Sequence, residues 1–235
     1  MKAPNTKMLT LIAMLAAVYA VGSYLPGFPL IGASDSEIDL VRALDIGYGI
    51  ILGPVYGPLT AFIGAVVGKV LTGGGFGLFL TPLAPVSAFI AACMTRRVVF
   101  KVHGWMLSSG LFGLLILAWY GTTTGRAVPF FPVFHIIALG MIIIYRGKIV
   151  DYINNSEQET VSIGVALSSF PSTMAGHMLG NLIYIFILKP EPLVFVGLLP
   201  ITFLERVVIT ILSMVITTPL LSVIKNMYPD LAEKS

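Results

Sequence analysis

Four polar residues recur at helical spacing in the hydrophobic segment "TMAGHMLGNLIYIF". Thr173, His177, Asn181 and Tyr184 stand at i, i+4, i+8 and i+11, which places them in one stripe along an α-helix. Inside a membrane, a histidine and an asparagine must face a cavity or a partner, because lipid would leave their polar atoms unsatisfied. The stripe therefore predicts either hydrogen bonds between helices or contact with a polar ligand.

An acid and a base stand side by side in the last hydrophobic stretch, "LLPITFLERVVIT". They are Glu205 and Arg206. Adjacent residues on a helix point about 100° apart, so we expect each to need another partner. The planar guanidinium of Arg206 suits a carboxylate or phosphate, which it can bind through two hydrogen bonds. A structural ion pair with Lys69, Asp45 or His177 is the alternative.

Other polar and aromatic residues are expected at the same mouth of the predicted helix bundle, including the hydroxyl run Thr122–Thr124 and Arg126. Trp119 and Tyr120 are typical of a membrane interface, and His135 by itself is more typical of a structural residue. The candidate substrate-binding residues are Asp45, Tyr48, Thr173, His177, Asn181, Tyr184, Glu205 and Arg206.

The sequence lacks the usual motifs of catalysis and metal binding. His103, His135 and His177 stand in separate segments, without carboxylates at metal-ligand spacing, and no Walker A, G-x-S-x-G or H-E-x-x-H motif occurs. The single cysteine, Cys93, excludes an internal disulfide and a thiolate cluster. We therefore expect a protein that is not an enzyme and that has no catalytic residues, no metal and no cofactor.

The composition indicates a membrane protein. Hydrophobic residues make up 57% of the chain and charged residues only 11%, whereas soluble domains carry about 25% charged residues. So few charges cannot cover a surface that faces water. We expect an all-α integral membrane protein, a polytopic helix bundle that forms a single domain over 1–235. The basic pI, about 9.0, then reflects topology anchors rather than contact with nucleic acid.

Spanning helices need roughly 20 apolar residues. The stretch 43–72 is too long for one such helix, and two Gly-Pro pairs interrupt it in "GPVYGP". Proline removes a backbone N–H and clashes with the preceding turn, so a break is expected there. The other predicted spans are 8–26, 79–97, 104–121, 129–145, 162–188 and 199–222.

Two topologies are compatible with this break. If 43–72 is one kinked span, the chain has seven helices, and its Lys and Arg residues divide roughly eight to five in favour of an outside N-terminus. If "GPVYGP" is a turn between helices at 43–54 and 58–72, the chain has about eight helices and both termini are cytoplasmic. We favour the second topology, because it places nine basic residues inside and four outside. The nine are Lys2, Lys7, Arg96, Arg97, Lys101, Arg146, Lys148, Lys225 and Lys234, and the four are Arg42, Lys69, Arg126 and Lys189.

Small residues form two pairs on the first predicted helix. Ala13 and Ala17 share one face, and Ala16 and Ala20 share another. Small residues four apart let a second helix approach closely in lipid, where packing drives association. These alanines predict either internal packing or a docking face for another membrane subunit.

Four of these features together resemble the substrate-binding S components of energy-coupling-factor (ECF) vitamin and micronutrient transporters. An alanine-rich first helix leads through a loop to "DIGYGIILGPVYG", 45–57, and a small-residue helix follows, "FIGAVVGKVL". A later helix ends in "TRR", 95–97, and the last one opens with the pattern LP-x-x-x-x-E-R, 199–206. The resemblance implies a divergent member, whose core covers 8–101 and 160–224 and whose additional helix pair lies at 104–145.

In this family the subunit captures a small molecule outside the cell and delivers it with the help of partners. The resemblance therefore implies a multi-pass protein of the cell membrane that meets lipid, a transmembrane coupling subunit and two ATPases. The alanine face of the first helix would meet the coupling subunit, and the loop 27–45 would close over the substrate. Two alternatives remain open at this point. One is a membrane enzyme for a lipid or isoprenoid that uses His177, Glu205 and Arg206, and the other is a scaffold subunit or channel.

Overall fold

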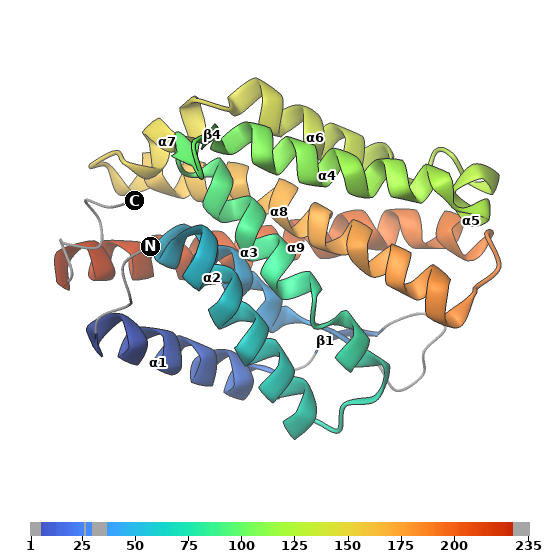
Figure 1. Ribbon diagram of the computed structural model, residues 1–235, viewed down its shortest axis with the longest axis horizontal. Helices are drawn as coiled ribbons and strands as arrows, with labels where there is room; N and C mark the ends of the chain where they lie inside the picture. Colours follow the sequence, from blue (N-terminus) through green and yellow to red (C-terminus); the bar gives the residue numbers. More distant parts are fainter. Residues whose placement is uncertain (1–5, 26, 30–36, 228–235) are drawn as a thin grey trace.

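The computed structural model describes residues 6–25, 27–29 and 37–227 (Figure 1). Two short antiparallel hairpins, β1 (Gly27–Pro29) with β2 (Glu37–Asp39) and β3 (Val98–Val99) with β4 (Val102–His103), interrupt an otherwise helical chain. The helices are α1 (Thr6–Gly22), α2 (Ala43–Leu71), α3 (Leu83–Met94), α4 (Gly104–Gly121), α5 (Thr123–Ala127), α6 (Val133–Tyr145), α7 (Lys148–Ile153), α8 (Gln158–Leu188) and α9 (Val194–Met227), with 3-10 turns η1 (Leu40–Arg42) and η2 (Gly75–Leu80). The middle of the predicted lid, 30–36, lies outside the described residues.

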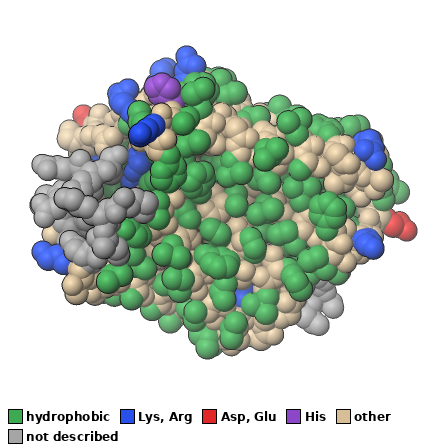
Figure 2. All heavy atoms as spheres, in the orientation of Figure 1, with side chains coloured by type: hydrophobic (Ala, Val, Ile, Leu, Met, Phe, Trp, Pro, Cys, Tyr) green, Lys and Arg blue, Asp and Glu red, His purple; other side chains and the backbone are tan. Residues whose placement is uncertain are grey.

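The described chain is all-α in character and suited to a membrane. Its helical stretches Leu40–Leu71, Gly75–Met94, Gly104–Gly121 and Val194–Met227 are long and apolar enough to cross one, and Thr6–Gly22 and Val133–Tyr145 are shorter apolar helices. Figure 2 shows hydrophobic side chains over the middle of one face and most Lys and Arg side chains toward its two ends. This distribution matches a hydrophobic belt between two polar boundaries.

The break predicted within 43–72 is present. Gly53 has φ +83° and ψ −174°, so α2 consists of two helices joined at this residue. Gly49 and Gly57 would be about 12 Å apart along a continuous helix. Instead, a Cβ built on Gly57 would lie 2.7 Å from the Gly49 Cα atom, so the chain folds back on itself.

The turn was predicted over "GPVYGP", between helices at 43–54 and 58–72, and the structure places it at the first residue of this segment. Only glycine adopts a positive φ without strain, and Gly53 is the residue that does so. Pro54 then begins the second half of α2, where its missing N–H has no consequence because the first turn of a helix leaves that donor unpaired. The first Gly-Pro pair therefore forms the turn, and the second lies inside the following helix.

Arg96 closes the broken end of the first half of α2. The last four carbonyl groups of a helix lack partners in that helix. The Arg96 guanidinium donates hydrogen bonds to the carbonyl oxygens of Ile50 (3.0 Å) and Gly49 (3.4 Å), and also to that of Ala92 (3.1 Å). The residue is only 8% exposed. Arg96, the first arginine of "TRR", thus connects the turn of α2 to the end of α3 through hydrogen bonds.

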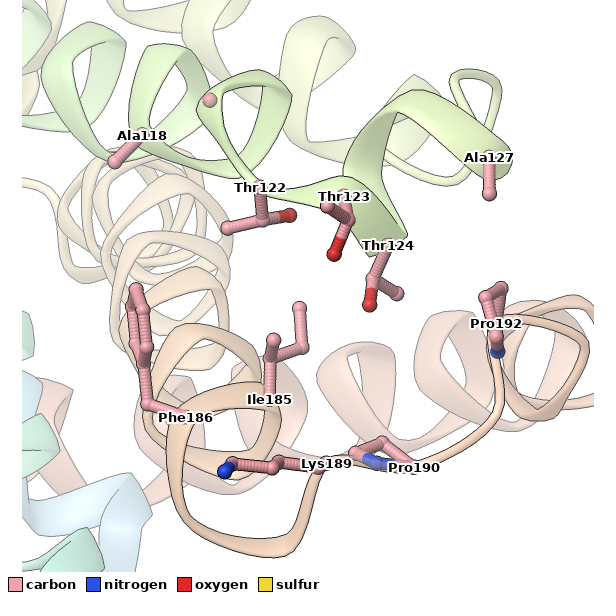
Figure 3. Close-up of a pocket in the computed structure, with 11 residues that line it drawn as sticks. Ala118, Thr122, Thr123, Thr124, Ala127, Ile185, Phe186, Lys189, Pro190 and Pro192 are labelled. Carbon is pink, nitrogen blue, oxygen red and sulfur yellow. The ribbon is translucent and has the colours of Figure 1, made fainter.

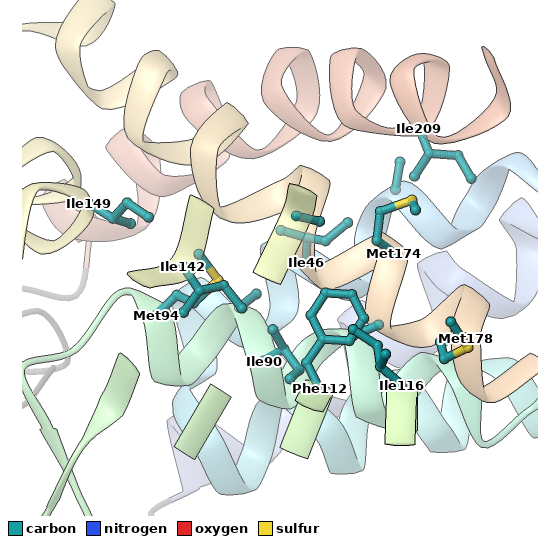
Figure 4. Packing of buried hydrophobic residues seen from close by; sticks show 14 of the residues in the cluster. Ile46, Ile90, Met94, Phe112, Ile116, Ile142, Ile149, Met174, Met178 and Ile209 are labelled. Carbon is teal, nitrogen blue, oxygen red and sulfur yellow. The ribbon is translucent and has the colours of Figure 1, made fainter. Parts of the chain in front are cut away.

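The additional helices α4 and α6 share the core of the bundle. Phe112 of α4 and Ile142 of α6 belong to the same buried cluster as Ile90 of α3 and Met174 of α8, and Figure 4 shows these side chains converging. The Ser108 hydroxyl on α4 also donates to the Ile90 carbonyl (3.2 Å). The described residues therefore form one packed bundle.

The two alanine pairs of α1 have different surroundings. Ala16 and Ala20 are buried and face the second half of α2, since a Cβ on Gly64 would lie 3.1 Å from the Ala16 oxygen and one on Gly68 would lie 3.4 Å from the Ala20 Cα atom. Ala13 and Ala17 are exposed. Close internal packing therefore accounts for one pair, and the other pair lies on the surface.

Gly49 provides a test of the packing between α2 and α3. A Cβ on Gly49 would lie 2.0 Å from the Ala88 carbonyl oxygen, whereas one on Gly110 of α4 would meet nothing within 4 Å. Gly49→Ala should destabilise the protein by about 1–3 kcal/mol because the helices must separate. Gly110→Ala should leave stability unchanged or raise it through helix propensity. Thermal unfolding in detergent micelles measures both, and equal melting temperatures would contradict this packing.

Candidate functional site

Charged and polar side chains from four helices meet inside the bundle and form what we call the buried polar cluster. Every member is at most 8% exposed. Direct contacts and electrostatic interactions connect the residues into one group. They are Arg42 and Asp45 from η1 and the start of α2, His135 from α6, Thr173, His177 and Asn181 from α8, and Glu205 and Arg206 from α9.

Arg206 is at the centre of this cluster. Its Nη1 atom donates to the Thr173 hydroxyl (3.0 Å), and its Nη2 atom contacts Glu205 directly. The second contact corrects the expectation that the two neighbours would not pair. Both side chains are long enough to bend toward each other, and an unpaired charge in an apolar interior would cost several kcal/mol. The buried Nε atom of Arg206 has no hydrogen-bond partner within the described residues.

Two histidines from different helices face each other beside Arg206. His135 Nε2 lies 3.1 Å from His177 Nδ1, and the Asn181 amide nitrogen lies 3.2 Å from the same Nδ1 atom. The rings are nearly parallel, 14° apart. If both neighbours donate to it, His177 Nδ1 is an acceptor and its proton is on Nε2. His135 Nδ1 is then a buried acceptor that nothing in the described chain satisfies.

Arg42 and Asp45 contribute a second pair of opposite charges. Their closest side-chain atoms are 3.9 Å apart, and Arg42 Nη2 also donates to the Leu80 carbonyl (3.0 Å). Both residues interact electrostatically with Arg206. Arg42 was predicted only as a topology charge, because nothing in its local sequence pattern indicates that it interacts with Arg206 of α9.

Two of the candidate residues lie apart from the cluster. The Tyr48 hydroxyl donates to the Leu15 carbonyl (2.6 Å), and its ring packs against Tyr19, so it joins α2 to α1. The Tyr184 ring packs between Phe76 and Phe195. The structure therefore brings together Asp45, Thr173, His177, Asn181, Glu205 and Arg206 of the eight predicted residues.

An aromatic layer adjoins the cluster. Trp119 stacks on Phe131 (ring centroids 4.8 Å apart), and Phe195 packs edge-on against both rings. Phe131 in turn contacts the rings of His135 and His177. Trp119 is fully buried, which corrects its interpretation as an interfacial residue. Its indole N–H has no partner in the part of the chain that the structure describes.

A recess of about 900 Å³ opens at the same end of the bundle. Figure 3 shows the side chains of Thr122, Thr123 and Thr124 on one side of it and Lys189 on the other, with Ile185 between them. Ala118 and Ile185, which also line the recess, directly precede Trp119 and directly follow Tyr184 in the chain. The hydroxyl run expected at the mouth of the bundle therefore lines a hollow.

The chemistry of the cluster is that of polar recognition. Its two arginines and two carboxylates cancel in formal charge, and the ring nitrogens of its two histidines are within hydrogen-bond distance of each other. Residues 6–25, 27–29 and 37–227 contain no group of three or more His, Cys, Asp or Glu side chains placed to hold a metal ion. The arrangement can bind a small polar molecule through charge-assisted hydrogen bonds.

Comparisons with known proteins give one sequence relative and no assigned family. A protein of Methanocaldococcus jannaschii named MJ0923 and described as uncharacterized is 27% identical over 180 residues. The match covers 76% of this chain and 59% of that protein, so the chain spans less than two thirds of its relative. No family model matches the chain, and no solved structure matches it.

The pairing of Glu205 with Arg206 can be tested by a double-mutant cycle. Glu205→Gln or Arg206→Gln should each cost about 3–5 kcal/mol of stability, because each leaves a buried charge without its partner. The double variant should cost less than the sum of the two. The exposed pair Arg97 and Asp151 (2.5 Å) is the control, and its variants should change stability by less than about 1 kcal/mol. Additive effects at Glu205 and Arg206 in denaturant unfolding would contradict the pairing.

Proposed function

We propose that this chain is the substrate-capturing membrane subunit of an ECF-type uptake system for a small vitamin-like molecule or micronutrient. The observation that carries the proposal is the buried polar cluster, which gathers two arginines, two carboxylates and two histidines inside an apolar bundle. Polar and ionisable groups in such surroundings are costly and mark ligand or ion sites. A helix interrupted by glycine and proline, here at Gly53, is likewise a feature of transporter binding regions.

The proposed topology has eight membrane crossings, with α2 contributing two. Figure 1 shows the start of α1, the end of α9, α7 and β4 at one end of the molecule, and α5 at the other. The first end includes Arg97, Lys101 and Arg146, whereas the second includes Arg126 and Lys189. The excess of positive charge supports a cytoplasmic location for the first end, with the start of α1 and the end of α9. The cluster then lies in the outer half, since His135 is in the first turn of α6, the helix that follows α5.

The cluster also indicates what kind of ligand it would take. Arg206 Nε and the Trp119 indole N–H are buried donors whose hydrogen bonds are unused within the described residues. A ligand with an anionic or strongly accepting group would satisfy such donors. The aromatic rings of Trp119, Phe131 and Phe195 offer an apolar surface beside them. A small, polar molecule with an apolar or aromatic part fits both features.

The exposed pair Ala13 and Ala17 is the proposed docking face for the transmembrane coupling subunit. The larger side chains beside it, Leu9, Met14 and Val18, are about half exposed, from 52% to 61%. Small residues flanked by apolar ones allow another membrane helix to approach closely. Two partner ATPases would supply the energy.

Ligand binding is tested by thermal unfolding of the purified protein with pools of vitamins, nucleobases and amino acids. A bound ligand at 100 times its Kd stabilises a protein by about 2.7 kcal/mol, so the wild-type melting temperature should rise. His177→Gln should abolish this rise, because it removes the imidazole that contacts both His135 and Asn181 in the cluster. Tyr48→Phe, outside the cluster, should keep it.

Two results would contradict the proposed binding function. One is a melting temperature that no pool shifts, with no small molecule found by mass spectrometry in the purified protein. The other is turnover of a lipid or isoprenoid by the wild type and not by Glu205→Gln, which would identify a membrane enzyme.

The docking face is tested by two matched alanine variants. Ala17→Trp should abolish uptake in cells while the purified protein still binds its ligand, because the added ring would block only an outside helix. Ala16→Trp should lower the melting temperature, because Ala16 packs against Gly64 of α2. Full uptake by a stably folded Ala17→Trp protein would exclude this face as the docking site.

A further inference from the structure

The hairpin between α3 and α4 has a strained turn. Val99 pairs with Val102, so Phe100 and Lys101 form a two-residue turn, and both have positive φ angles, 51° and 67°. Such turns favour Asn and Gly, because a side chain costs about 1–2 kcal/mol in this conformation. A large aromatic and a cation at the tip of a strained turn suggest that these side chains have a role outside the fold.

The hairpin exposes apolar side chains next to cations. Phe100 is 59% exposed, Val98 58% and Val102 39%, and Lys101 and His103 alternate with them in sequence. Apolar side chains beside Lys and Arg are the composition of segments that lie at the boundary between lipid headgroups and acyl chains. The hairpin is therefore suited to a membrane interface rather than to water.

A positively charged recess of about 320 Å³ lies at the base of this hairpin. Its lining includes Arg96, Arg97, His103, Trp105 and Arg146. Figure 2 shows a histidine among Lys and Arg side chains at the upper left of the molecule, where Figure 1 places β4. Arginines from two segments of the chain, with the imidazole of His103 between them in sequence, thus surround one hollow.

The charges of this recess are not balanced by the described residues. Arg97 pairs with Asp151, and Arg96 is committed to backbone carbonyls. Arg146 lies over the Trp105 ring, 5.2 Å from its centre, and has no carboxylate partner among the described residues. An anion is therefore the complementary occupant.

We propose that the hairpin β3–β4 and the recess below it bind the headgroup of an anionic phospholipid. The phosphate would lie near Arg146 and His103, and the side chains of Phe100 and Val98 would contact the adjoining acyl chains. Trp105, at the start of α4, fits the preference of tryptophan for the headgroup level. Anionic lipids attract basic residues beside membrane helices by about 1 kcal/mol for each Lys or Arg. This site is independent of the proposed uptake function.

The site is tested on the full chain, purified in micelles, with four probes. Native mass spectrometry should detect retention of dioleoyl phosphatidylglycerol, and dioleoyl phosphatidylcholine should bind at least tenfold more weakly. Inorganic phosphate should not displace phosphatidylglycerol at equal concentration, because it lacks the chains that contact the hairpin. Equal retention of the two lipids would overturn the proposal. Displacement by phosphate would identify a free-anion site, and displacement by polyglutamate would identify an acidic protein partner, so each would also overturn it.

The variant Arg146→Gln distinguishes lipid binding in this recess from nonspecific attraction to basic side chains. It should weaken phosphatidylglycerol binding about fivefold, the change that corresponds to about 1 kcal/mol per cation near an anionic surface. Arg126→Gln is the matched control, because it removes an exposed cation at the opposite end of the bundle. Equal effects of the two variants would show a nonspecific attraction and overturn the proposal.

Phe100→Gly distinguishes lipid contact from a structural role. Glycine accepts the positive φ without strain, so the melting temperature in lipid-free micelles should stay the same or rise. Affinity for phosphatidylglycerol should fall, because the aromatic contact with acyl chains is lost. A lower melting temperature with unchanged lipid affinity would assign Phe100 to the fold and contradict the proposal.

Discussion

A helix that ends inside an apolar bundle must have partners for its last carbonyl groups, and Arg96 meets this requirement for the first half of α2. Backbone groups without water or protein partners cost several kcal/mol in a membrane interior. The chain can therefore turn at Gly53 only because α3 ends where its arginine reaches Gly49 and Ile50. The turn allows the two halves of α2 to pack closely. Helix α1 then packs against Gly64 and Gly68 of the second half.

The same requirement shapes the buried polar cluster. Arg206 cannot be left alone in an apolar interior, and it is satisfied in part by Thr173 on α8 and by Glu205 on its own helix. The histidine pair links α6 to α8 in the same region. The helices α6, α8 and α9 are thus joined through polar contacts, and the aromatic layer around Trp119 packs against the histidine pair. Under the proposed function, the side chains that stabilise the cluster would also bind the ligand, and the polar atoms left unused in the described chain would be its contacts.

The site was only partly predictable. The helical spacing of Thr173, His177 and Asn181 identified the residues that α8 contributes to the cluster, because polar side chains on an apolar helix need polar partners. His135 and Arg42 carry no such local signal, since their role depends on which helix lies opposite. Tyr48 was predicted to bind substrate as one of the polar residues at the mouth of the bundle, but its hydroxyl donates to the Leu15 carbonyl of α1 instead. The pairing of Glu205 with Arg206 was missed because backbone angles on a helix do not fix where flexible side chains end.

The sequence by itself determined the class of the protein and most of its elements. Composition indicated a membrane protein, the apolar runs placed the long helices within a few residues, and the Gly-Pro pairs predicted a break between 43 and 72, because these signals depend only on local chemistry. Tertiary structure decided where the chain turns, which alanine face is free and which polar side chains meet. Those outcomes depend on contacts between residues far apart in the chain, such as Arg96 with Ile50 and His135 with His177. Close packing and the free-energy cost of unpaired polar groups determine these contacts, and both act only when all the helices are in place.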